Sequence, residues 1–307
     1  MLLETLFALT AHANVYDASP ECKAVQHISA PNSDLPTKKE IAELKKCDSE
    51  KPYYGIGQKV DYKKARHCAF AQLENEEDDV FWGGRTILYM IYANGYGVKQ
   101  NRKLALKYAC GLESAPAEIS GRIEHLKKEG KIDFCDDITS GYAQGFCQSR
   151  DNDIAKAVRE EKFANLPFKG PAFEKLKSAS AEFTKARAEN EVDQSGTARA
   201  AQQLQEEDIQ ERDFLESLQT FAAGKAPHFN RKKEDDHLND VFKKVMAFKD
   251  PANWWGTVTK DNILKTQRAW IKYRNAWREF AGADKADQVD AWFTKKRAHM
   301  LESFTKN

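Results

Sequence analysis

The segment TQRAWIKYRNAWREFA, residues 266–281, holds two tryptophans, one tyrosine and three arginines. Counted from Ile263, alternating steps of four and three place one set of side chains on a single helical face: Ile263, Gln267, Trp270, Arg274, Trp277 and Ala281. Trp270 and Trp277 are therefore predicted to anchor a core. Tyr273 and Arg274 are predicted to make a buried hydrogen bond or to stack, because guanidinium planes lie well on aromatic rings.

The composition around this segment indicates an all-α protein. The chain has 307 residues, enough for two domains, with only 9 prolines and 16 glycines. Its 48 basic and 47 acidic side chains nearly balance, so the net charge does not indicate binding to nucleic acid or to an anionic membrane. No run of 18 apolar residues follows the N-terminus, so no membrane span is expected. No motif calls for a cofactor, and none is expected.

Helical periodicity is densest in the second half of the chain. Glycines and two cysteines interrupt it at residues 131–147, which favours a domain boundary there. We predict a signal peptide at 1–13, a helical-repeat region at 14–130 and a helical bundle at 131–307. The helices expected beyond that boundary are 150–165, 171–192, 197–222, 233–249, 259–281 and 285–304.

The N-terminus resembles the end of a secretory signal. An apolar run at residues 2–9 precedes Ala11-His12-Ala13, a small-x-small pattern that predicts cleavage after Ala13. A positive n-region is missing, so the signal could begin further upstream. The alternative is an ordinary apolar helical turn.

The six cysteines are Cys22, Cys47, Cys68, Cys110, Cys135 and Cys147. An even number together with a signal peptide favours disulfides in an oxidising compartment, and the lack of any CxxC pair argues against structural zinc. Local pairing is the simplest arrangement: Cys22 with Cys47, Cys68 with Cys110, and Cys135 with Cys147. If the signal is absent, buried thiols in the cytosol are the alternative.

Two segments of the first half repeat with an offset of 40 residues. YYGIGQKVDYKKARHCA at 53–69 and YANGYGVKQNRKLALKYA at 92–109 each carry Gly-x-Gly, then Asp61 or Asn101, then Ala65 or Ala105. The glycines allow a chain reversal, the polar residue can cap a second helix, and alanine permits close helix approach. Over residues 38–130 this pattern resembles the Sel-one-like repeat. That resemblance implies stacked helix pairs that contact other proteins.

A weaker echo, with an offset of 87 residues, indicates a duplication in the second half. EFTKARAE aligns Phe183, Lys185 and Arg187 with Trp270, Lys272 and Arg274. NDIAKAVRE at 152–160 similarly echoes LNDVFKKVM at 238–246.

Residues 134–307 resemble the LprI-type lysozyme-inhibitor domain, whose helices carry spaced motifs of the form LN..Y, Q..W..YR and T..R...L. The matching positions are Leu238, Asn239 and Phe242; Gln267, Trp270, Tyr273 and Arg274; Thr294, Arg297 and Leu301. These motif residues are expected to be structural. The family usually has a cysteine where this chain has Arg278, so Cys147 needs another partner, and Cys135 is the nearest one. Because Cys22 lacks a lipobox, we expect a periplasmic or secreted protein without a lipid anchor.

The resemblance implies a protein that binds a lysozyme and blocks its glycan cleft. Since lysozymes are commonly basic, carboxylates are the expected contact groups. One acidic cluster is Glu74, Glu76, Glu77, Asp78 and Asp79. The other comprises Glu206, Glu207, Asp208 and Glu211, continuing to Asp213 and Glu216. The alternative for each cluster is a solvated helix face or loop.

Two other functions compete with this interpretation. An enzyme is disfavoured because the chain has no Gly-x-Ser-x-Gly elbow, His-Glu-x-x-His motif or Walker loop. His228, Asp235, Asp236 and His237 could be read as metal ligands, although their irregular spacing favours a solvated loop and helix start. The closer alternative is an immunity protein that neutralises a secreted effector, or an envelope adaptor that uses its repeats.

Overall fold

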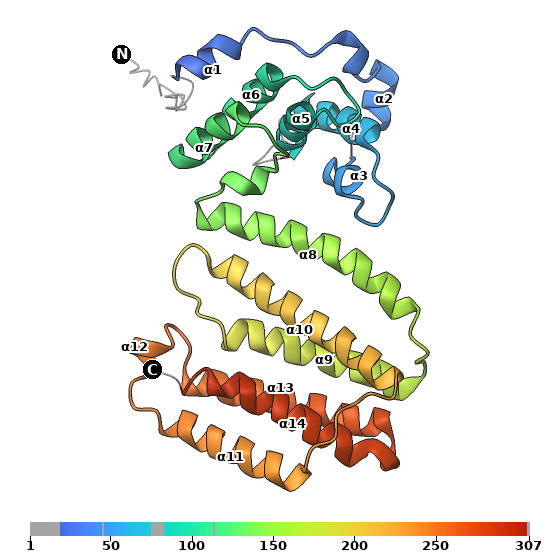
Figure 1. Cartoon of the computed structure of the whole chain (residues 1–307), viewed down its shortest axis with the longest axis vertical. Coiled ribbons are helices and arrows are strands. Elements are labelled where there is room, and N and C mark those ends of the chain that lie inside the picture. The colour runs from blue at the N-terminus through green and yellow to red at the C-terminus, as the bar shows by residue number, and fades with distance from the viewer. Residues whose placement is uncertain (1–18, 45, 75–82, 113, 306–307) are drawn as a thin grey trace, which may run out of the picture. The chain divides into compact units, whose positions relative to one another are not determined.

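The computed structural model describes residues 19–44, 46–74, 83–112 and 114–305, and the predicted signal peptide at 1–13 lies outside them. Every regular element in these ranges is a helix, which confirms the all-α prediction (Figure 1). The chain divides into two compact units, Met1–Thr139 and Ser140–Asn307. None of the helices in the described ranges is long and apolar enough to cross a membrane.

The first unit is organised around a buried helix, α5 (Gly83–Asn94), whose side chains from Thr86 to Ala93 are all inaccessible to solvent. Its main neighbours are α4 (Tyr62–Glu74) and α6 (Arg102–Cys110), which pack on either side. The remaining elements are shorter: α1 (Pro20–Val25), η1 (Asn32–Asp34), α2 (Lys38–Glu43), α3 (Glu50–Tyr54), α7 (Pro116–Lys127) and η2 (Phe134–Asp137). The run of apolar residues in α5 thus forms the centre of the unit.

The 40-residue repeat corresponds to two helix pairs, α3–α4 and α5–α6, with the same turn. Gly55 and Gly57 have φ angles of 76° and 67°, and Gly95 and Gly97 have 72° and 67°, a left-handed backbone that favours glycine. The amide of Asp61 donates to the Pro52 carbonyl at 2.8 Å, and that of Asn101 donates to the Tyr92 carbonyl at 2.9 Å. The donor and the acceptor of the second bond each lie 40 residues after those of the first. The predicted chain reversal is therefore confirmed in both copies of the repeat.

The caps and contacts predicted for these pairs are also present. The Asp61 side chain accepts from the Lys64 amide at 2.9 Å, and the Asn101 side chain accepts from the Leu104 amide at 3.0 Å. Ala65 and Ala105 are completely buried where the helices meet. The repeat therefore predicted the local geometry of both pairs.

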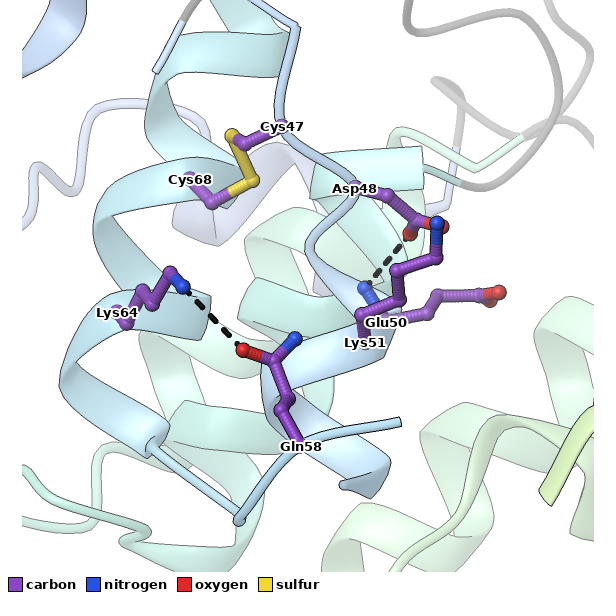
Figure 2. The surroundings of a disulfide bond; sticks show 7 residues. All are labelled: Cys47, Asp48, Glu50, Lys51, Gln58, Lys64 and Cys68. Atoms are coloured by element: carbon purple, nitrogen blue, oxygen red, sulfur yellow. Dashed lines mark hydrogen bonds and ion pairs between the residues drawn. A yellow bond between two sulfur atoms is a disulfide. The ribbon is translucent and has the colours of Figure 1, made fainter. Parts of the chain in front are cut away.

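Two of the three predicted disulfide pairings are wrong. Cys22 bonds to Cys110, and Cys47 bonds to Cys68, as Figure 2 shows for the second pair. Local pairing fails because α1 packs against α6, which brings together cysteines that are 88 residues apart. Cys135 and Cys147 are disulfide-bonded as well, and no described cysteine is free. The disulfides indicate an oxidising compartment.

The second unit consists of two three-helix halves with the same packing. In the first half, α10 (Arg199–Ala222) packs against both α8 (Gly141–Ala164) and α9 (Pro171–Asn190). In the second half, α14 (Ala286–Glu302) packs against both α11 (Arg231–Ala247) and α13 (Lys260–Ala281). Helices α9 and α13 join the halves, as Figure 1 shows, and α12 (Pro251–Trp254) and η3 (Ala283–Lys285) are short connections. This correspondence supports the duplication indicated by the 87-residue echo.

The echoed residues occupy comparable places in the two halves. Phe183 and Trp270 are each 3% exposed in the same core. Arg187 pairs with Glu206 of α10 at 2.6 Å, and Arg274 pairs with Asp290 of α14 at 3.2 Å. Each arginine thus joins the middle helix of its half to the third helix.

Helix α8 starts at Gly141, well before the predicted residue 150, and Gly141 is a position of close packing rather than a helix break. A Cβ on Gly141 would lie 2.4 Å from the Thr197 backbone, so only glycine fits this approach. The Ser140 side chain caps the helix by accepting from the Ala143 amide at 3.2 Å. The predicted interruption up to residue 147 is therefore wrong in its second part.

Candidate functional site

The family-motif residues lie mainly in the core of the second unit. Trp270, Tyr273, Thr294, Arg297 and Leu301 are each at most 4% exposed. Tyr273 stacks on Phe183 with ring centroids 5.3 Å apart, and its burial raises the pKa of the phenol. Leu238 is also buried and Phe242 packs against the same core, whereas Asn239 is exposed. These side chains hold helices together and offer little surface to a partner.

Gln267, Arg297 and Glu191 form the polar centre of that core. Arg297 Nε donates to Gln267 Oε1 at 2.9 Å, and its two terminal nitrogens donate to the two oxygens of Glu191. Burial alone would raise the pKa of Glu191, but the charges of Arg297 and Arg187 outweigh burial and lower it. Two motif residues are therefore parts of a charged clamp between α9 and α14.

Arg278, which stands where the resembled family has a cysteine, takes part in a second charged cluster. It donates to Asp290, which is only 1% exposed and also pairs with Arg274 at 3.2 Å and Arg231 at 2.9 Å. Arg274 in addition lies over the Trp270 ring at 4.8 Å. The carboxylate of Asp290, on α14, thus forms ion pairs with arginines from both α11 and α13.

The residues considered as metal ligands have separate partners. Asp236 pairs with Lys232 at 2.7 Å, His237 pairs with Glu302 at 2.9 Å, and Asp235 lies 3.8 Å from Arg274. His228 lies 3.1 Å from the side-chain nitrogen of Gln288. Within the ranges that the structure covers, no three His, Cys, Asp or Glu residues are grouped closely enough to hold a metal ion.

The two acidic clusters differ in their surroundings. Glu74 is the last residue of α4 and is exposed, while Glu76, Glu77, Asp78 and Asp79 lie outside the described residues. The second cluster, on α10, is fully described. It does not form a uniform acidic face, because its members point to three different surroundings.

Three members of the α10 cluster are tied to arginines. Glu206 accepts from Arg187 of α9, whereas Asp208 and Glu211 both accept from Arg159 of α8, the latter at 2.6 Å. Arg159 is only 8% exposed, so this pair of bonds fixes α8 against α10. Further along the helix, Asp213 pairs with Lys296 at 2.6 Å, and Glu216 is exposed.

Glu207 differs from these neighbours, because it faces an open groove that is bordered by α8, α9 and α10. We call this the α8–α10 groove, and its volume is about 710 Å³, within the range of roughly 300–1,000 Å³ that ligand sites have. From α8 it is lined by Lys156, Arg159, Glu160, Phe163 and Ala164. From α9 the lining is Phe173, Lys177, Ser180, Ala181, Thr184, Lys185 and Glu189, and from α10 it is Glu207, Glu211 and Phe214.

Small side chains make up part of the groove's lining on α9. Ser180, Ala181 and Thr184 leave room that a larger residue would fill. Phe163 of α8 and Phe214 of α10 meet at one end, with ring centroids 5.8 Å apart, and Phe173 is 6% exposed. This end of the groove is therefore apolar.

The other end of the groove carries charges of both signs, and Glu207 is its carboxylate without an ion pair. Glu207 is half-buried and has no ion-pair or hydrogen-bond partner among the described residues. Its pKa is raised by burial and by the neighbouring carboxylates of Glu211 and Glu189, against the smaller opposing effect of Lys185. Lys185 itself pairs with Glu189 at 3.7 Å and is largely exposed. The groove thus keeps a carboxylate without an ion pair beside an apolar surface.

The sequence indicated part of this site. The acidic run of α10 was visible, but its division between arginine pairs and the groove depends on helix packing. Phe163, Phe173 and Glu189 were missed, because nothing in their local sequence separates a groove wall from a core or surface position. Comparison with protein-family models, with curated proteins and with solved structures finds no match for this chain.

Proposed function

We propose that this protein is a non-catalytic, periplasmic or secreted inhibitor that binds another protein, and that its target is a lysozyme or another cell-wall hydrolase. The observation that carries the proposal is the α8–α10 groove, where Glu207 faces open space and has no ion-pair partner among the described residues. An uncompensated, partly desolvated carboxylate costs folding free energy, which a cation supplied by a partner would recover.

The choice of target rests on three further supports. The spacing of Gln267, Trp270, Tyr273 and Arg274 resembles the lysozyme-inhibitor domain. The disulfides suit the oxidising compartment where cell-wall hydrolases act. Lysozymes are commonly basic, so a groove with a free carboxylate would attract them and accelerate binding.

The first unit fits the same proposal as an accessory contact region. Its two helix pairs share their turn, cap and close-packed alanine with an offset of 40 residues. We assign these pairs to the Sel-one-like type, in which stacked helices commonly bind other proteins. Removing this unit is expected to weaken binding without abolishing it, since the groove belongs to the second unit.

The test is a titration of purified lysozymes of several structural types with the full-length, oxidised protein. Residual hydrolysis of peptidoglycan should fall to zero near one equivalent for at least one type. A parallel pull-down from periplasmic extract identifies other hydrolase targets. If no lysozyme is inhibited and no hydrolase is captured, the proposal is wrong, and capture of housekeeping envelope proteins alone would favour an adaptor.

A further inference from the structure

The α8–α10 groove has a polarity along its length that defines what can occupy it. Phe163 and Phe214 lie at one end, and Glu207 lies at the other. The lining extends from Phe173 to Glu189 along α9, about 24 Å at the helical rise of 1.5 Å per residue, and covers about 10–12 Å along α8 and α10. Such an elongated shape suits a segment of polypeptide better than a compact small molecule.

The charges of the lining favour a basic occupant at the Glu207 end. Two of the neighbouring cations already have acidic partners: Arg159 binds Asp208 and Glu211, and Lys185 binds Glu189. Lys177 pairs with Glu174 at 2.9 Å. Lys156 of α8 also lines the groove without an ion pair among the described residues, but it is exposed and is not among the charges that shift the pKa of Glu207. Glu207 is half-buried and forms an ion pair with none of these side chains, and only Lys185 partly offsets its charge.

The positions of the two ends also set a spacing. Glu207 and Phe214 are two helical turns apart on α10, which corresponds to about 10 Å. A partner helix matches that distance with side chains at positions i and i+7, which lie on one face. In an extended chain the matching positions would be i and i+3, at roughly 3.3 Å per residue.

From this geometry we infer that the groove binds a helical segment of the target protein that places an apolar side chain against Phe163 and Phe214 and an Arg or Lys seven residues away against Glu207. This inference rests on the proposed function for the presence of a protein target, and it adds the chemistry of the segment. The apolar residue gains burial against the phenylalanine rings. The basic residue forms a charge-assisted bond in a partly desolvated place.

The experiment uses the full-length oxidised protein and three synthetic helical peptides of equal composition. The first carries Leu at position i and Arg at i+7, the second moves the Arg to i+9 on the opposite face, and the third exchanges it with a Glu elsewhere in the peptide. Fluorescence anisotropy measures the Kd of each. The first peptide should bind about tenfold more tightly than the other two, since each lacks the pair with Glu207.

Three variants assign the binding to the groove. Glu207→Gln should remove the preference for the first peptide, because the amide has no charge to pair with Arg. Ala181→Phe should fill the groove and abolish binding of all three peptides, while the matched control Ser178→Phe adds the same ring on α9 outside the lining and should change nothing. Circular dichroism of every variant checks that the helices remain folded.

The outcomes separate this inference from the proposed function. If no peptide binds, or if binding survives Ala181→Phe unchanged, or if a small amine such as an alkylammonium binds as tightly as the first peptide, the inference is wrong. If lysozyme is inhibited equally by wild type and Ala181→Phe, the function stands and the groove is not its site. If the first peptide binds as described while no hydrolase is inhibited, the groove chemistry stands and the proposed target is wrong.

Discussion

Arg297 and Glu191 form a bidentate ion pair in which both side chains are completely buried, with nitrogen–oxygen distances of 2.9 and 2.5 Å. The pair joins α14 to the C-terminal end of α9, and Gln267 of α13 accepts the remaining Nε hydrogen of Arg297. Three helices from both halves of the second unit are therefore held by one guanidinium group. A buried charge pair of this kind constrains how the helices pack.

Arg297→Met is expected to destabilise the second unit by about 3–5 kcal/mol, because it leaves the carboxylate of Glu191 buried with Arg187, at 3.2 Å, as its remaining charged partner. The double variant Arg297→Met, Glu191→Leu should recover most of this loss, since the charge that remains, Arg187, keeps its pair with Glu206 at 2.6 Å. Urea unfolding of both variants and of Glu191→Leu gives the coupling energy. Additive effects of the two single changes would contradict the clamp.

The two disulfides of the first unit should stabilise it unequally. Removing Cys22–Cys110 with paired serines should cost about 4–5 kcal/mol, and removing Cys47–Cys68 about 3 kcal/mol, because the first closes a loop of 88 residues and the second a loop of 21. Denaturant midpoints measure the difference. Peptide mapping of the non-reduced protein tests the pairing itself, and a Cys22–Cys47 peptide would show that the connectivity is wrong.

Gly84→Ala is expected to destabilise the first unit by about 1–3 kcal/mol, the usual cost of overpacking. A Cβ at this position would lie 2.2 Å from the Ala69 carbonyl oxygen, so α4 and α5 would have to move apart. Gly145→Ala in α8 is the matched control, because the nearest atom to its Cβ would be 3.5 Å away. Thermal melts of both variants should show a lower Tm for Gly84→Ala only, and equal Tm values would contradict the close approach.

These contacts show why the sequence predicted some features and not others. The repeat predicted the turns at Gly55 and Gly95, because a left-handed backbone requires particular residues locally. Trp270 and Trp277 were predicted in the core from periodicity alone, and both are at most 3% exposed. The partners of Cys22 and Arg297 are 88 and 106 residues away, and local patterns carry no information about such pairs.

The groove illustrates the same limit. Glu206, Glu207 and Asp208 are consecutive and chemically alike, yet their surroundings differ. Glu206 pairs with an arginine of α9, Glu207 lines the groove, and Asp208 pairs with an arginine of α8. A helix turns by about 100° per residue, so neighbouring carboxylates necessarily face different surroundings. Which of them stays unpaired depends on where Arg187 and Arg159 lie, and that is decided by the packing of three helices.

Glu207→Gln is expected to raise the Tm at neutral pH, because the ionised carboxylate is desolvated and repelled by Glu211 and Glu189. Its folded-state pKa lies above the unfolded value, so ionisation opposes folding, and the wild type should gain stability as the pH falls through the folded pKa. The advantage of the variant should therefore vanish below about pH 4, near the unfolded pKa of glutamate. Glu160→Gln, on the exposed side of the lining, is the control and should leave the Tm unchanged. A lower Tm for Glu207→Gln at neutral pH would contradict an unpaired carboxylate.

The most direct test of the central claim is a stoichiometric titration of lysozyme activity with three forms of the full-length protein. Wild type and Ser178→Phe should each abolish hydrolysis near one equivalent, whereas Ala181→Phe, which fills the α8–α10 groove, should not inhibit at that ratio. Equal inhibition by all three forms, or no inhibition of any lysozyme type by the wild type, would contradict the account.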